Sequence, residues 1–209
     1  MKINKLYIIA IILTTGCTSA KITSTWIDKN ADFNKYQKIL VLSIYGEKDR
    51  SIHQQIENHL VNDLKDNGYT AISALNEFGP KIFENKSEED VIKNLKINNI
   101  DAIITIVLLD KRKERKYIPG NIYYTPMGNY YSRFWGYRGM IYNRIYEPGY
   151  YVTESQYFWE SNLYDLSTQK MLYSVQTKSF NIDNANNFGH EYSKIIMKNM
   201  LEKGVIINK

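Results

Sequence analysis

Residues 38–45 (KILVLSIY) and 101–109 (DAIITIVLL) decide the fold of this 209-residue chain, because both are nearly continuous runs of leucine and β-branched residues. Such runs are typical of strands that are buried on both faces of a mostly parallel sheet. Between them, apolar residues recur every three or four positions at residues 52–64 and 91–97, as in amphipathic helices. With a weaker strand expected at residues 69–75, the order strand, helix, strand, helix, strand predicts an α/β sheet with right-handed crossovers.

The ends of these helices carry typical capping residues. Ser51 and Ser87 are the expected N-caps, and Asp90, three residues after Ser87, completes a near capping box. Gly68 is expected to end the first helix in the left-handed conformation that glycine adopts easily. The loop after the second strand is expected at residues 76–85.

The second half of the chain has a different pattern. Residues 152–165 and 170–180 predict two antiparallel strands joined by a short turn, and residues 184–203 predict a last helix, which Gly204 ends. We therefore expect one α/β domain at residues 25–209. It would be a three-layer-like mixed sheet, with parallel N-terminal strands, an antiparallel C-terminal hairpin and packed helices.

An insertion at residues 111–151 is the most unusual part of the sequence, because tyrosine and arginine are dense in it and acids are few. Aromatic rings and guanidinium groups are enriched at protein interfaces, and they also stack on sugars or sit at lipid headgroups. The alternatives are packing of the rings on one another, contact with a protein or glycan, and contact with a membrane surface. The candidate partner-binding residues are Tyr124, Tyr130, Tyr131, Arg133, Phe134, Trp135, Tyr137 and Arg138.

The insertion opens with a basic run at residues 111–116 (KRKERK). Its simplest interpretation is the solvated leg of a hairpin. The functional alternative is attraction to anionic lipid headgroups or to wall polymers.

The N-terminus predicts export. Lys2 and Lys5 precede a short apolar run at residues 6–13, which is too short to cross a bilayer but suits a secretory signal peptide. Residues 13–17 (LTTGC) resemble the lipobox of bacterial lipoproteins, although Leu13 lies four residues before the cysteine where the family usually has three. That resemblance implies a signal peptide at residues 1–16, a lipid on Cys17 and a tether at residues 17–24. Several acyl chains on one residue would give stable anchoring.

The composition narrows the possible functions. Cys17 is the only cysteine, so the mature domain would have neither a disulfide nor a cysteine-based metal site. The net charge is +5, and an envelope protein with this modest excess is not expected to bind nucleic acid. His53 and His59 are six residues apart and would lie on different faces of their helix, so neither a metal nor a cofactor is expected.

Catalytic motifs are missing from the sequence. There is no Gly-x-Ser-x-Gly turn and no glycine-rich phosphate loop after the expected strands. An enzyme would therefore need a pocket in which ordinary carboxylates converge. The candidates for such a pair are Glu57, Asp101, Asp110, Glu154 and Glu160.

Several short motifs together resemble an uncharacterised family of bacterial envelope lipoproteins that carry a domain of unknown function. The resemblance implies an exported lipoprotein with an α/β domain, and it supplies no catalytic residues. The matching pieces are Trp26, residues 32–36 (DFNKY), residues 38–43, Arg50 before Glu57 and Leu60, Gly68, residues 101–102, residues 147–150 (EPGY) and residues 163–170 (LYDLSTQK).

Three functions remain open. The first is a non-catalytic binding or assembly factor, which predicts an exposed aromatic patch on the insertion. The second is a hydrolase that acts on cell-wall or lipid material, and the third is a mainly structural envelope protein. Thr18 follows the cysteine where enteric lipoproteins retained at the inner membrane have an acid, and this resemblance implies an outer-membrane anchor. No acidic tract of the kind linked to surface export follows Cys17, so we expect the protein to face the periplasm.

Overall fold

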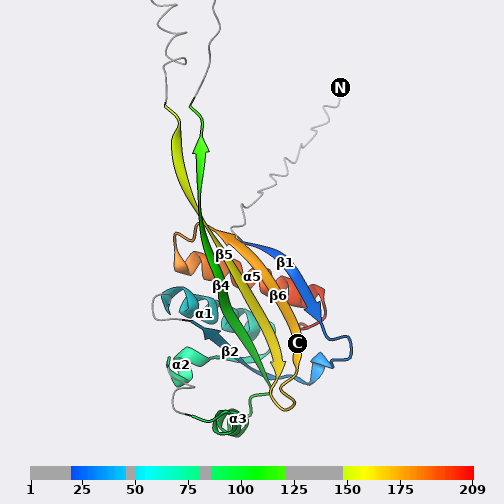
Figure 1. Ribbon diagram of the computed structural model, residues 1–209. Coiled ribbons are helices and arrows are strands. Elements are labelled where there is room, and N and C mark those ends of the chain that lie inside the picture. The colour runs from blue at the N-terminus through cyan, green and yellow to red at the C-terminus, as the bar shows by residue number, and fades with distance from the viewer. Residues whose placement is uncertain (1–19, 46–49, 81–85, 121–147) are drawn as a thin grey trace, which may run out of the picture.

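The computed structural model describes residues 20–45, 50–80, 86–120 and 148–209. They form one six-stranded mixed sheet with the strand order β1-β6-β5-β4-β2-β3, and helices pack against it (Figure 1). The α/β class expected from the sequence is confirmed. The strands are β1 (Ala20–Ile27), β2 (Lys38–Ile44), β3 (Thr70–Ser73), β4 (Ala102–Ile118), β5 (Tyr150–Asp165) and β6 (Met171–Phe180). The helices are η1 (Phe33–Lys35), α1 (Arg50–Asp66), α2 (Ala74–Phe78), α3 (Glu88–Ile97) and α5 (Ala185–Glu202).

The parallel part of the sheet is centred on β2. This strand pairs in parallel with β3 on one side and with β4 on the other. A right-handed crossover to each side places the connecting helices on opposite faces of the sheet. Accordingly, α1 belongs to the larger hydrophobic core, whereas α3 belongs to a smaller core on the other face.

The helix α1 has the apolar stripe expected from its sequence, with Ile56, Leu60 and Leu64 fully buried. It ends at Gly68, whose φ is +86°, while Tyr69 N–H donates to the Leu64 carbonyl. This is the left-handed termination that glycine permits. The start differs from the expectation, because the helix already includes Arg50 and Ser51 therefore lies inside its first turn.

The second strand is shorter than expected. β3 ends at Ser73, whose hydroxyl accepts a hydrogen bond from Asn76 N–H and so caps α2. Ala74 and Leu75, expected in the strand, are buried residues of this short helix. A serine that can cap the chain locally competes with strand continuation, and here the cap prevails.

Side-chain caps also start the later helices, at Ser87, as expected from the sequence, and at Asn184. Ser87 Oγ accepts from Asp90 N–H and donates to the Asp90 carboxylate at the start of α3. Asn184 caps α5 through Asn187 N–H, and Gly204 follows the helix with φ +69°. Each of these side chains satisfies a backbone donor that a helix leaves unpaired at its start.

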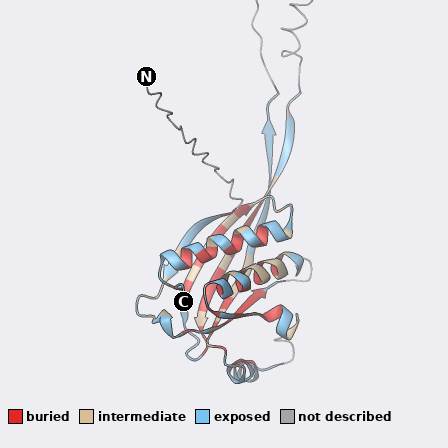
Figure 2. Cartoon of the chain, turned by 180° about the vertical axis from the view of Figure 1, so that it is seen from behind, coloured by how far each residue is buried: buried red, intermediate tan, exposed pale blue. Residues whose placement is uncertain are grey.

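The remaining strands are antiparallel. β5 pairs with both β4 and β6, and β1 forms the outer edge beside β6. β1 begins at Ala20, within the stretch that we expected to be a tether. Figure 2 shows α1 and α5 covering one face of the sheet, with buried residues between the layers. The largest fully buried side chains there are Trp159, Tyr173 and Tyr192.

Candidate functional site

The hairpin formed by β4 and β5 projects from one end of the sheet. Toward this end of the sheet, pairing between β2 and β4 stops at Val107 and pairing between β6 and β5 stops at Gln156, yet β4 and β5 pair with each other as far as Ile118 and Tyr150. Residues 114–118 and 150–154 therefore form a two-stranded ribbon without a third strand beside it among the described residues. Figure 1 shows this ribbon standing away from the helices.

A bulge between Leu108 and Asp110 decides where the side chains of the hairpin point. Before the bulge, the even-numbered residues of β4 face the larger core. The pairing skips Leu109, so that Lys111 lies opposite Tyr157, which is buried in the same core. After the bulge, the odd-numbered residues of β4 consequently lie on the face that α1 and α5 cover farther down the sheet.

The charged residues on this face of the hairpin are all cations. Lys111, Lys113 and Arg115 alternate along β4, and all three are exposed. The β5 residues opposite the last two are Ser155 and Thr153, which carry no charge. We call Lys111, Lys113 and Arg115 the cationic row.

Aromatic rings accompany the cationic row. The Lys111 ammonium lies 4.8 Å from the ring centre of Tyr157, and the Arg115 guanidinium lies 5.1 Å from that of Tyr151. The rings of Tyr151 and Tyr117 are themselves 5.1 Å apart. These contacts confirm that the cations and rings share one face, and they are close enough for cation–π attraction.

The opposite face of the hairpin carries both cations and acids. Arg112 is paired with Asp110 at 2.7 Å, and its guanidinium lies 5.0 Å from the ring centre of Phe158. Lys116 shares this face with Glu114 and Glu154, which lie directly opposite each other. The positive charge of the basic run is therefore concentrated on one side of the hairpin.

The outer end of the ribbon is apolar on both faces. Its large side chains are between about one third and two thirds exposed, although apolar groups normally avoid water. A cluster of exposed rings is the feature that a binding surface predicts. These residues are Tyr117, Ile118, Tyr150, Tyr151 and Val152.

The candidate partner-binding residues lie between the two legs of this hairpin in the sequence, but outside the described residues. They are Tyr124, Tyr130, Tyr131, Arg133, Phe134, Trp135, Tyr137 and Arg138. The expected lipidation site, Cys17, also lies outside the described residues. The two legs that carry the aromatic segment are described, and they identify residues 111–116 as a hairpin leg. In the described part of the chain, no helix is both long and apolar enough to cross a membrane.

A buried carboxylate fills the crevice at the carboxyl ends of β2 and β3. Glu57, on α1, accepts hydrogen bonds from Ser43 N–H at 2.7 Å, from the Ser73 hydroxyl at 2.5 Å and from Leu75 N–H at 3.1 Å. Burial raises the pKa of Glu57 above its ordinary value, and these hydrogen bonds oppose the rise. Both oxygens are engaged, so this carboxylate fastens α1 to two strand ends.

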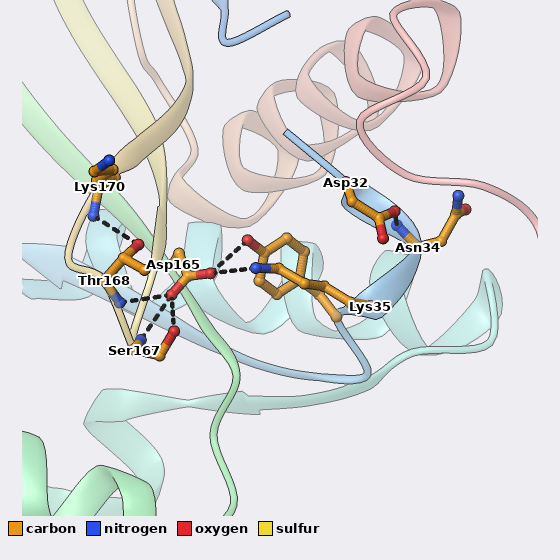
Figure 3. A network of polar contacts seen from close by, with 8 residues as sticks. Asp32, Asn34, Lys35, Asp165, Ser167, Thr168 and Lys170 are labelled. Atoms are coloured by element: carbon orange, nitrogen blue, oxygen red, sulfur yellow. Dashed lines mark hydrogen bonds and ion pairs between the residues drawn. The ribbon is translucent and has the colours of Figure 1, made fainter. Parts of the chain in front are cut away.

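A second carboxylate joins two of the family-like motifs, which are 130 residues apart in sequence (Figure 3). Asp165 accepts from the Lys35 ammonium at 2.7 Å and the Tyr36 hydroxyl at 2.8 Å. Its other oxygen accepts from Ser167 N–H, the Ser167 hydroxyl and Thr168 N–H. Burial alone would raise the pKa of Asp165, but these hydrogen bonds outweigh it and hold the pKa well below its ordinary value.

An apolar groove of about 570 Å³ lies between α3 and the sheet. Its size falls within the range of small-molecule sites. Asp165 and Glu88 contribute the acids of its lining, and the Asp165 oxygens are already occupied by five donors. The apolar side chains of the lining are Leu42, Val91, Ile92, Leu95, Ile103 and Leu166.

Asp101 and Glu160, two of the other candidate acids, have separate partners. Asp101 accepts from the backbone N–H groups of Gln37 and Lys38, and Glu160 accepts from the amides of Asn162 and Gln176. Of the five nominated acids, Glu57 alone lines one of the described cavities, a hollow of about 180 Å³. The convergent pair that a hydrolase requires is therefore not seen among the described cavities.

His53 and His59 lie apart, as their spacing predicts. His53 is buried and stacks on Tyr45, with ring centres 4.9 Å apart, whereas His59 lies beside His190 on α5. Within the described ranges, no three His, Cys, Asp or Glu side chains come together in a way that could hold a metal ion.

Comparisons with known proteins give distant similarity. No family model and no curated protein matches the sequence. A solved PelC dodecamer from Paraburkholderia phytofirmans is 8% identical, with 91% of this chain and 99% of that one covered and a TM-score of 0.44. A lipoprotein from Neisseria meningitidis is 11% identical, with 79% and 99% covered and a TM-score of 0.42. A neuraminyllactose-binding hemagglutinin homologue from Helicobacter pylori is 9% identical, with 81% and 88% covered and a TM-score of 0.41. At these values the likeness carries no argument about what this chain binds.

Proposed function

We propose that this chain is a lipid-anchored protein of the bacterial cell envelope that acts as a non-catalytic binding or assembly factor. It contacts an envelope protein or glycan through the ribbon and the Tyr/Arg-rich segment that the ribbon carries. The anchor is a lipid on Cys17, after removal of residues 1–16, in an outer membrane and facing the periplasm. No nucleic acid and no cofactor take part.

One observation carries this proposal: exposed rings gather at the outer end of a ribbon that projects from a well-packed body. Tyr150 and Tyr151 are 59% and 63% exposed, although Tyr117 and Tyr151 contact each other. Tyrosine offers a large, rigid contact area and a polar hydroxyl, which suits a protein or sugar surface. A protein with a purely structural role would gain nothing from leaving these rings in water.

The alternative of a hydrolase has less support. Glu57 and Asp165 are the buried carboxylates with shifted pKa values, and every oxygen of both accepts a hydrogen bond from the protein. A general acid or base needs an oxygen that can reach its substrate. These two groups instead hold elements of the body together.

The proposal predicts that the ribbon can be removed without unfolding the body. Lys113 and Ser155 are cross-strand partners, so an Asn-Gly turn can join them in place of residues 114–154. We expect the shortened chain to keep the unfolding midpoint of the whole chain in urea. Formaldehyde crosslinking of intact cells should yield a discrete heavier adduct with the whole chain and none with the shortened one.

A second variant is the control for this experiment. A whole chain with Tyr117, Tyr150 and Tyr151 replaced by serine keeps the ribbon and should also lose the adduct. If the shortened chain still forms the same adduct, the partner binds the body and the proposal is wrong.

A further inference from the structure

The described chain begins at the end of the sheet from which the hairpin projects. Ala20 pairs with Ser179, Ser179 with Tyr157, and Tyr157 with Lys111, so these four residues form one row across adjacent strands. Neighbouring strands are about 4.8 Å apart, which places Ala20 about 15 Å from Lys111. From this row β1 runs toward the opposite end of the sheet (Figure 1).

This register limits where a lipid anchor could lie. Cys17 is separated from Ala20 by three peptide units, which span about 11 Å at most. An anchor on Cys17 would thus hold the base of the hairpin close to the membrane. The ribbon, rather than the opposite end of the body, would be the part next to the lipid.

The cationic row suits an anionic surface on that side. Its three side chains are about 6.8 Å apart along the strand, all are exposed, and no acid lies opposite them. The pair Tyr117 and Tyr151 follows at the outer end of the same face. Cations attract anionic headgroups, and tyrosine rings prefer the interface between headgroups and hydrocarbon.

We propose that the cationic row and the Tyr117–Tyr151 pair form a membrane-contact face that binds anionic phospholipid headgroups. The face orients the ribbon on the membrane surface, so that Tyr150, on the opposite face of the ribbon, stays accessible to the partner. The proximity of Ala20 and the amphipathic rings favour lipid over a soluble wall polymer. Only the role of the anchor rests on the proposed function, because the face itself is made of described residues.

The test is binding of the unlipidated full chain (Cys17→Ser) to vesicles, measured by sedimentation. Vesicles rich in phosphatidylglycerol should bind the protein, those of phosphatidylcholine alone should not, and added salt should weaken binding. A triple variant removes the charge of the cationic row: Lys111→Gln, Lys113→Gln and Arg115→Gln. It should bind the vesicles on the order of 100-fold more weakly, because each cation near the surface strengthens binding about fivefold.

A matched variant removes the same charge from the opposite face. Arg112, Lys116 and Lys178 lie there, since Lys178 is the β6 partner of Phe158. Replacing these three by glutamine should weaken binding less than about tenfold, because their distance from the surface leaves them partly screened. Both variants should keep the unfolding midpoint of the parent, since their side chains lie outside the hydrophobic cores.

Several outcomes would overturn the proposal. Equal losses in the two variants would mean that net charge alone drives adsorption. Equal binding to both kinds of vesicle would mean that the rings act without the cations. Binding to soluble dextran sulfate but not to vesicles would assign the face to a polymer. None of these results bears on lipidation, which is tested separately by incorporation of labelled palmitate at Cys17.

Discussion

Replacing Asp165 with alanine is expected to lower the free energy of unfolding by about 3–5 kcal/mol, as measured by urea denaturation. The side chain of Asp165 is 3% exposed and receives hydrogen bonds from Lys35, Tyr36, Ser167 and Thr168. Its removal would leave two backbone donors and the buried Tyr36 hydroxyl without this acceptor. The turn after β5 and the segment before β2 would then lose their common attachment.

An exposed acid provides the control for this variant. Replacing Asp66, at the exposed end of α1, by alanine should change the free energy of unfolding by no more than about 0.5 kcal/mol.

The pH dependence of stability in the variant Asp165→Asn gives a second check. Because the folded pKa is lowered, the stabilisation by Asp165 is present at neutral pH and is lost as the pH falls below about 4. The difference between wild type and the asparagine variant should therefore narrow in acid, and a constant difference would contradict the assignment.

Replacing Glu57 with alanine is expected to cost about 4 kcal/mol, which is the second large effect. The change leaves a cavity beneath α1 and removes the acceptor of Ser43 N–H, Leu75 N–H and the Ser73 hydroxyl. Glutamine should also destabilise the protein, because its NH2 group would meet one of these donors. Urea denaturation of both variants measures the effect.

The sign of the pH dependence at Glu57 is opposite to that at Asp165. The folded pKa of Glu57 is raised, so the folded state binds a proton more readily than the unfolded state. The contribution of Glu57 to the free energy of unfolding is therefore fully present below about pH 4.3, and it declines as the pH rises toward the folded pKa. The stability difference between wild type and Glu57→Gln should consequently shrink from acid toward neutral pH. A difference that grows over this range would contradict the raised pKa.

Much of the body could be predicted because local patterns and tertiary structure agree. β2 is apolar along its length and buried on both faces, and α1 and α5 carry apolar residues at helical spacing. The cap at Ser87 and the glycine ends at Gly68 and Gly204 also follow local rules. The α2 helix was missed because its start depends on a single serine side chain within an apolar stretch.

The two buried carboxylates could not have been assigned from the sequence. Both short motifs around Asp165 were recognised, yet nothing local indicates that Lys35 and Asp165, 130 residues apart, share a hydrogen bond. Glu57 was nominated as a possible catalytic acid, and its three donors come from segments that only the parallel sheet brings together. Long-range contacts of this kind depend on topology, which residue spacing does not encode.

The concentration of cations on one face of the hairpin could likewise not be predicted from the sequence. Residues 111–116 read as a continuous basic run, which could be solvated on every side. The bulge at Leu109 determines which cations share a face, and the sequence contains no glycine or proline there to indicate it. Once the bulge is placed, alternation along β4 separates the cationic row from Arg112 and Lys116.

The central claim, that the ribbon is the part that meets a partner, is tested most directly by photo-crosslinking in intact cells. The probe replaces Tyr150 on the ribbon or Trp135 in the sequence between the two ribbon strands, and the control probe replaces the exposed Lys65 on α1. In a protein that incorporates labelled palmitate, we predict a discrete protein or glycan adduct from the first two positions and none from Lys65. The same adduct from all three positions, or an adduct from Lys65 alone, would contradict the account.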